Sequence, residues 1–143
     1  PVKKLGWAPI YSALGKTGVT VALTGEAAVN PNIPDQGLPF AMAHEMAHRL
    51  CIARDDETNF SAFLACAENE SVAYQYSGYF MAYRYCYMSL VSAGTTEAAA
   101  AAARVNSGVG SKLYQDLQYY AQFFSKTRGG GTVTATVKDI LGN

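Results

Sequence analysis

The sequence predicts a mainly helical α+β domain, and three observations lead to this class. Long stretches combine helix-favouring residues with apolar positions at helical spacing. One short β-branched stretch precedes them. The chain has 143 residues, of which half are hydrophobic and 15% are charged, so it is long enough to bury one core. We therefore expect residues 1–143 to form a single domain with a small strand region near its beginning.

The non-helical part is expected within the first 37 residues. Pro9–Leu14 favours a short helix. Val19–Thr24 is β-branched and apolar and lies between Gly18 and Gly25, which predicts a strand. Asn30–Gly37 is dense in turn-forming residues, and we expect a loop there.

Helices fill most of the remaining sequence. Proline suits the first turn of a helix, so a helix should begin at Pro39. Asp55 and Asp56 break the pattern and offer caps for the next helix. The predicted helices are Pro39–Ile52, Glu57–Ala67, Ser71–Val91, an alanine-rich segment at Glu97–Arg104, and Ser111–Ser125. The inward side of the second helix is predicted to hold Phe60, Phe63, Leu64 and Ala67. Gly129–Gly131 is expected to be flexible.

Charge and cysteine content exclude several classes of protein. Eleven acidic and eleven basic residues balance, so we expect no nucleic-acid partner and no electrostatic attraction to an anionic membrane. The cysteines, Cys51, Cys66 and Cys86, fit neither a disulfide framework nor a cysteine zinc site, and we expect buried thiols. No apolar run reaches the length of about 18–20 residues that a membrane helix needs, and no signal peptide is visible. The chain starts at Pro1 without an initiator Met, which suggests a piece of a longer protein.

The motif His44-Glu45-Met-Ala-His48 contains both histidines of the chain. On a helix, positions four apart share a face, so His44 and His48 can reach one metal ion. Glu45 lies about 100° further round the helix, where it can contact a water molecule held by the metal. This HExxH spacing is the zinc-protease signature. It predicts a Zn²⁺ site with two histidine ligands and a general base.

A catalytic zinc ion takes three protein ligands, and no third histidine remains. The nearby candidates are Asp55, Asp56, Glu57, Glu68, Glu70 and Cys51. Glu57 is the preferred ligand, because it lies one turn before Phe60 and two turns before Leu64, on the predicted inward side of its helix. Asp55 and Asp56 are interpreted as solvated helix-capping acids and remain alternatives.

The expected reaction is hydrolysis of a peptide bond by metal-activated water. Glu45 would accept the proton of this water and deliver it to the leaving amine. The oxyanion needs a second donor, and the tyrosine-rich third helix offers Tyr76, Tyr79 and Arg84. The strand Val19–Thr24 would pair with an extended peptide substrate.

Several blocks of the sequence together resemble a known bacterial family. These blocks are Thr24–Asn30, Leu38–Phe40, His44–His48, Asp55–Phe60, Leu64–Cys66 and Tyr76–Tyr79. In this order and spacing they resemble the membrane-protein family known as domain of unknown function 3810, whose members are similar to zincin metallopeptidases. The resemblance extends from about Lys3 to Tyr87.

The resemblance implies a zincin-like fold and further expectations for the site. Family members carry transmembrane helices before this domain, so the full-length protein would be membrane-anchored, on an unknown side, and the present chain a soluble fragment. The family's acidic block is Glu-x-Glu-Ala-Asn-Phe. Asp55 stands here for the first Glu, and Glu57 matches the second, which supports Glu57 but leaves Asp55 open. The family's usual Gly after the second histidine is Cys51 here.

Together, motif and resemblance predict a zincin-like zinc metallopeptidase with His44, His48 and Glu57 as ligands. Glu45 is the predicted general base, with Tyr76 and Arg84 as candidate oxyanion donors. One alternative is a catalytically silent binding or sensor module with the same fold, although such a module needs no general base. The other is a structural zinc site closed by a fourth protein ligand.

Overall fold

A computed structural model of the chain describes residues 2–21 and 23–127. The elements run in the order β1 (Lys3–Lys4), α1 (Ala8–Ala13), β2 (Gly18–Val21), β3 (Glu26–Val29), α2 (Leu38–Arg49), α3 (Asp55–Ala67), α4 (Val72–Ser92), α5 (Thr96–Ser107) and α6 (Ser111–Thr127). The predicted mainly helical α+β class is confirmed at this level. The segment Gly129–Gly131 lies outside the described residues.

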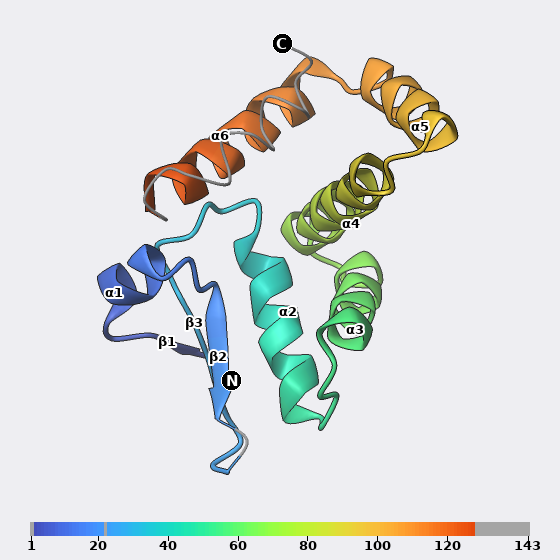
Figure 1. Cartoon of the computed structure of the whole chain (residues 1–143). Coiled ribbons are helices and arrows are strands. Elements are labelled where there is room, and N and C mark those ends of the chain that lie inside the picture. The colour runs from blue at the N-terminus through green and yellow to red at the C-terminus, as the bar shows by residue number, and fades with distance from the viewer. Residues whose placement is uncertain (1, 22, 128–143) are drawn as a thin grey trace.

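Helix α2 runs between the small sheet on one side and α3 and α4 on the other (Figure 1). The sheet has the order β1-β3-β2, with β1 parallel and β2 antiparallel to β3. Within the described part of the chain, β2 pairs only with β3. In the described residues, the other edge of β2 therefore has no strand partner. Thr20 of β2 forms a hydrogen bond with Glu45 of α2.

The main core lies where α2, α3, α4 and α6 meet. It contains Phe40, Ala62, Cys66, Phe80, Met81, Leu117 and Tyr120. Gly78 lets α3 and α4 approach closely, because a Cβ atom there would lie 2.7 Å from Cβ of Cys66. A smaller core joins β3 and the loop before α2 to that helix through Val29, Ile33 and Ala41.

A buried serine fixes the start of α2 against α4. The hydroxyl of Ser77 accepts a hydrogen bond from the backbone N–H of Phe40 at 3.0 Å and donates one to the carbonyl of Gln36 at 2.7 Å. The first N–H groups of a helix have no partner within the helix. Ser77 therefore satisfies one of them and fixes α2 relative to α4.

Several local predictions differ from the structure. Strands β1 and β3 were not predicted, and β2 ends at Val21, before the predicted end of the strand. Helix α3 begins at Asp55, and its N-cap position is held by Arg54 without a side-chain cap, so neither predicted acid caps it. The cysteine prediction is wrong in part, because only Cys66 is buried and Cys51 and Cys86 are exposed.

The predicted inward side of α3 is wrong in part. Phe60 is 63% exposed and Leu64 is 45% exposed, whereas Thr58, Ala62 and Cys66 are buried. The helix is therefore rotated relative to the prediction. The small side chains pack against the neighbouring helices, Phe63 packs partly buried against the main core as predicted, and Phe60 and Leu64 lie on the outer side.

None of the helices in residues 2–21 and 23–127 is long and apolar enough to cross a membrane.

Candidate metal centre

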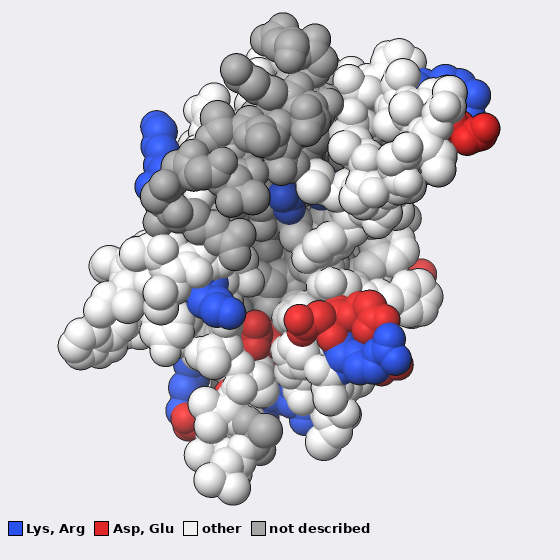
Figure 2. All heavy atoms as spheres, viewed as in Figure 1, with Lys and Arg blue, Asp and Glu red and all other residues white. Residues whose placement is uncertain are grey.

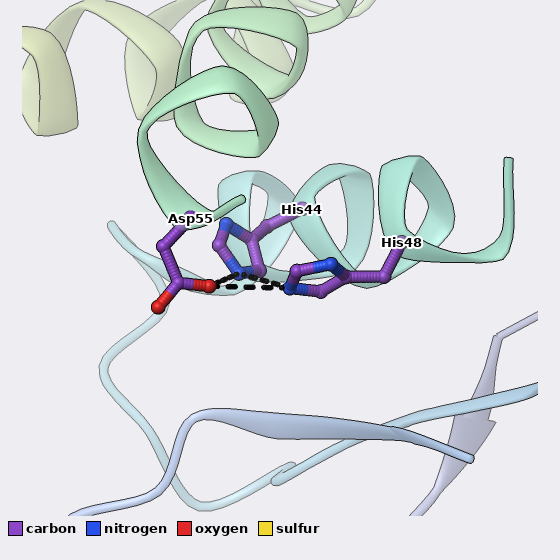
Figure 3. Close-up of side chains that lie close together, drawn as sticks. All are labelled: His44, His48 and Asp55. Carbon is purple, nitrogen blue, oxygen red and sulfur yellow. Dashed lines mark hydrogen bonds and ion pairs between the residues drawn. The ribbon is translucent and has the colours of Figure 1, made fainter. Parts of the chain in front are cut away.

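Two imidazoles and one carboxylate converge where α2 faces the start of α3 (Figure 3). His44 and His48 lie one turn apart on α2, and their Nε2 atoms are 3.1 Å apart. Oδ1 of Asp55 lies 3.4 Å from Nε2 of His48 and 3.9 Å from Nε2 of His44. Among the described residues, these three side chains form the group able to hold a metal ion.

The outer nitrogens of both rings are held by oxygen acceptors. Nδ1 of His48 donates to the carbonyl of Ile52 at 2.8 Å, and Nδ1 of His44 donates to Oδ1 of Asn59 at 2.9 Å. A carbonyl only accepts, so in the neutral form of each ring Nδ1 carries the proton and Nε2 carries the lone pair. Two lone pairs that face each other at this distance favour a cation between them. The same arrangement of outer partners orients histidine ligands in metal sites.

Burial helps to keep His44 in its neutral form. It lowers the pKa of His44, and this effect outweighs the opposite influence of the neighbouring Glu45 carboxylate. A neutral imidazole has the free lone pair that a metal ion requires.

The turn after α2 supplies the acceptor for His48. The N–H of Ile52 bonds to the carbonyl of Ala47, and the N–H of Cys51 bonds to the carbonyl of His48. These are the two bonds of a Schellman motif, whose left-handed residue is usually glycine. Cys51 occupies this position with a φ of 66°. The turn points the Ile52 carbonyl at His48 and directs the chain into α3.

Helical geometry explains why Asp55, and not Glu57, joins the histidines. Asp55 and Asn59 are four residues apart on α3, so both face α2. Glu57 lies about 200° round the helix from Asp55. It is 59% exposed, and its nearest charged partner is Nε of Arg54 at 3.9 Å. The structure therefore does not bring the predicted ligand Glu57 to the histidines.

The other acid of this turn is also engaged elsewhere. Asp56 receives two hydrogen bonds from the guanidinium of Arg54, at 2.7 and 3.1 Å. The hydrogen bond from Arg54 is the main cause that lowers the pKa of Asp56. Figure 2 shows acidic side chains gathered with a basic group in the region where α3 begins. Of these acids, Asp55 alone reaches the histidine pair.

Glu45 is buried beside the cluster and is held by β2. Its Oε2 atom accepts a hydrogen bond of 2.6 Å from the hydroxyl of Thr20, which also contacts the Glu45 carbonyl at 3.1 Å. A Cβ atom at Gly18 would lie 2.5 Å from Oε1 of Glu45 and 2.6 Å from its Cγ. The strand thus fixes the carboxylate from one side, and only glycine at position 18 allows this close approach.

A cavity of about 230 Å³ adjoins the centre, and His44 and Arg84 both line it. Arg84 stands over the ring of Tyr120, with Cζ 4.3 Å from the ring centroid. Tyr85 also lines the cavity, and burial is the main cause that raises its pKa, with the Asp55 carboxylate adding to the effect. Tyr85 had not been predicted as a site residue.

Tyr76 lies outside the residues that line this cavity. Its hydroxyl donates to Oδ2 of Asp116 at 2.5 Å, which joins α4 to α6. Asp116 is buried and also accepts from Lys112 at 2.7 Å and Gln36 at 2.9 Å. Burial acts to raise the pKa of Asp116, but these hydrogen bonds outweigh it and hold the pKa below its usual range. The structure therefore gives Tyr76 a packing role, and Tyr79 packs against Phe63 at 5.5 Å between ring centroids.

The sequence held signals for residues that the prediction did not prefer or did not name. Asp55 had been kept only as an alternative ligand, and Asn59 and Gly18 had no predicted role. Asp55 and Asn59 are both polar and four apart, which marks one face of α3. Gly18 and Thr20 alternate with apolar residues, as expected of a strand with one face against a polar group. No local pattern identifies Tyr85.

The chain matches the family model described as protein of unknown function (DUF3810) over residues 1–138. The chain belongs to this family. The matched range includes all three members of the histidine–aspartate cluster and Glu45. No curated protein and no solved structure matches the chain. The DUF3810 match supplies no reaction, so any function must be argued from the site.

Proposed function

We propose that this member of the DUF3810 family is a zinc-dependent peptidase whose metal is held by His44, His48 and Asp55. The observation that carries the proposal is the convergence of two imidazole Nε2 atoms and one carboxylate oxygen beside a separately held carboxylate, Glu45. Three ligands leave one position free for water or substrate, which is the arrangement of catalytic zinc sites.

The donor set fits zinc in chemistry and in spacing. Zinc accepts imidazole nitrogen at about 2.0–2.1 Å and carboxylate oxygen at about 2.0–2.2 Å in tetrahedral geometry, so two of its ligand atoms lie about 3.3 Å apart. The Nε2 atoms of His44 and His48 are 3.1 Å apart, and Asp55 lies 3.4 Å from the nearer one. The distance from Oδ1 of Asp55 to Nε2 of His44 is 3.9 Å, and small side-chain shifts would bring it to the spacing that zinc requires.

The protein's own groups divide the chemistry between them. When bound, zinc would lower the pKa of water toward about 7 and polarise the scissile carbonyl. Glu45 accepts the proton of the attacking water and returns it to the leaving amine. Thr20 keeps this carboxylate oriented through the 2.6 Å hydrogen bond. Asn59 and Ile52 hold the histidines in the tautomer that binds metal.

The edge of β2 supports a peptide as the substrate. Within the described residues this strand has one partner, and it lies against the helix that carries Glu45. An extended peptide can add to such an edge through its backbone, which would place a peptide bond near the cluster. A zincin-like fold and a membrane anchor elsewhere in the full-length protein remain parts of the same proposal.

The structure offers less support for the two alternatives. A closed structural site needs a fourth protein ligand, and the described residues place three ligating side chains together. A silent binding module has no use for Glu45, whose carboxylate is buried and hydrogen-bonded beside the histidines. A buried carboxylate is costly unless it is held in this way and serves a purpose.

The test combines metal analysis with peptide cleavage. Purified protein should bind one equivalent of zinc, and the zinc form should cleave members of a peptide library. Glu45→Gln should retain zinc but lose cleavage by a factor of about 100 or more, as expected for a general base. Glu70→Gln, an exposed acid beyond α3, is the matched control and should behave as wild type. Stoichiometric zinc without cleavage by wild type would contradict a peptidase and favour the binding module.

A further inference from the structure

The cavity beside the cluster combines a hydrophobic wall with one positive charge. Phe40, Met81, Tyr120 and Phe124 are among the residues that line it, together with His44 and Arg84. Its volume of about 230 Å³ is below the range of about 300–1,000 Å³ that is common for small-molecule pockets. The cavity therefore suits one amino-acid side chain better than a larger ligand.

Arg84 is held in place mainly by uncharged neighbours. Its guanidinium lies over the Tyr120 ring at 4.3 Å, and Nη1 approaches Sδ of Met81 at 3.6 Å. Among the described residues, no carboxylate lies within salt-bridge distance of Arg84. A guanidinium has five N–H donors in a planar fork that matches a carboxylate. No acidic side chain of the described residues thus forms an ion pair with the N–H donors of Arg84.

The guanidinium of Arg84 lies against the aromatic part of the cavity lining. The charge of Arg84 lowers the pKa of Tyr85 and of Tyr120, against the larger effect of burial. The charged groups that act on His44 are Glu45, His48 and Asp55. The cavity is thus lined by His44 of the cluster and by the cation Arg84, together with aromatic side chains.

We propose that this cavity receives the substrate residue next to the scissile bond and that Arg84 binds a carboxylate of that residue. The proposal rests on the proposed peptidase function and names its substrate class: peptides with a negative charge at this position. The carboxylate belongs either to an acidic side chain or to the peptide C-terminus, and both offer the same planar pair of oxygens. Arg84 thereby determines specificity and does not act on the oxyanion.

A binding experiment on metal-free protein tests Arg84 independently of catalysis. The protein is stripped with a chelator and dialysed free of it. The probes are 3-phenylpropionate and the uncharged 3-phenylpropionamide, titrated by protein-observed NMR. Wild type should bind the acid about 10-fold or more tightly than the amide, because a hydrogen bond between charged groups is worth about 1.5–3 kcal/mol. Arg84→Gln should lose this preference.

Two variants keep the binding experiment decisive. Arg104→Gln removes an exposed arginine of α5 that does not line the cavity, and it should retain the wild-type preference. Arg84→Lys keeps the charge but not the planar fork, and it should show an intermediate preference. It replaces Arg84→Gln in the experiment if that variant does not fold. Three outcomes would overturn the proposal. Wild type could bind acid and amide equally, it could bind neither up to about 10 mM, or its preference for the acid could survive Arg84→Gln.

Peptide pairs then distinguish the two sources of the carboxylate. The zinc form is compared on peptides that differ only by Glu against Gln, and on peptides that differ only by a free or amidated C-terminus. A loss of kcat/KM of about 10-fold or more on amidation identifies an exopeptidase, and the same loss on Glu→Gln identifies an acidic side chain. Indifference to both changes would refute the substrate class. Acid binding by metal-free protein without any cleavage would instead refute the peptidase function and leave the Arg84 site standing.

Discussion

Replacing Cys51 by glycine should stabilise the protein. Cys51 is the left-handed residue of the Schellman turn after α2, with a φ of 66°. A side chain in this conformation costs about 1–2 kcal/mol. Glycine removes that cost, but its greater freedom in the unfolded chain takes back about 0.5–1 kcal/mol. Cys51 is exposed, so little packing is lost. The net gain is about 0.5–1 kcal/mol, which raises Tm by about 1–4 °C in a chain of this size.

Urea denaturation followed by circular dichroism measures this gain in metal-free protein. Cys51→Ala is the first control and should leave stability almost unchanged, because alanine also disfavours a positive φ. Cys86→Gly is the second control, since it makes the same chemical change inside α4. It should lower stability by about 0.3 kcal/mol, because glycine has a lower helix propensity than cysteine. A destabilised Cys51→Gly protein would refute the strained turn. So would an equal gain in Cys51→Ala.

Two further substitutions test the surroundings of the site, and a third tests the buried contact between α4 and α6. Gly18→Ala places a Cβ 2.5 Å from Oε1 of Glu45 and should lower peptide cleavage at least about 10-fold and cost about 1–3 kcal/mol in stability; wild-type activity in a folded variant would show that β2 does not position Glu45. Thr20→Val removes the hydroxyl that donates to Glu45 and should lower kcat by about 10-fold with little change in KM, whereas a pure KM effect would contradict a role in orienting the base. Asp116→Asn tests a pH effect on stability. The pKa of Asp116 lies below its usual value, so its stabilising effect is present above the unfolded pKa of about 3.9 and is lost as the pH falls through the folded pKa. The urea midpoints of wild type and variant should therefore differ at pH 6 and approach each other at pH 3, and a constant difference would argue against it.

The histidine pair and the neighbouring Glu45 were predictable because they lie on one helix. His44, Glu45 and His48 are fixed relative to each other by 3.6 residues per turn, whatever surrounds them. The structure places them as that geometry requires. The remaining position of the cluster depends on how α3 crosses α2, and this is a tertiary property.

Glu57 was preferred as a ligand because the prediction placed Phe60 and Leu64 on the inward side of α3. The prediction grouped Glu57 with Phe60 and Leu64 because large apolar residues usually face the core. In the structure these two residues lie outside, and the inward side carries Thr58 and smaller residues. The side of α3 that faces the two histidines is polar at Asp55 and Asn59, so hydrophobic periodicity could not reveal it.

Contacts between helices far apart in sequence were also beyond local patterns. Tyr76 was a reasonable donor on the tyrosine-rich helix, but its hydroxyl meets Asp116, which lies 40 positions later. Arg84 shares a cavity with His44 because α4 and α6 close around the start of α2. Strand β3 was missed because Glu26–Val29 is short and contains two alanines, which are poor strand formers.

Zinc affinity in two single variants tests the proposed metal centre most directly. Asp55→Asn and Glu57→Gln remove one negative charge each, two residues apart on the same exposed turn of α3. Competition with a zinc-binding dye at neutral pH measures both against wild type. We predict that Asp55→Asn weakens zinc binding by about 10-fold or more and that Glu57→Gln leaves it within about twofold of wild type. A loss in Glu57→Gln with wild-type affinity in Asp55→Asn would contradict the histidine–aspartate centre.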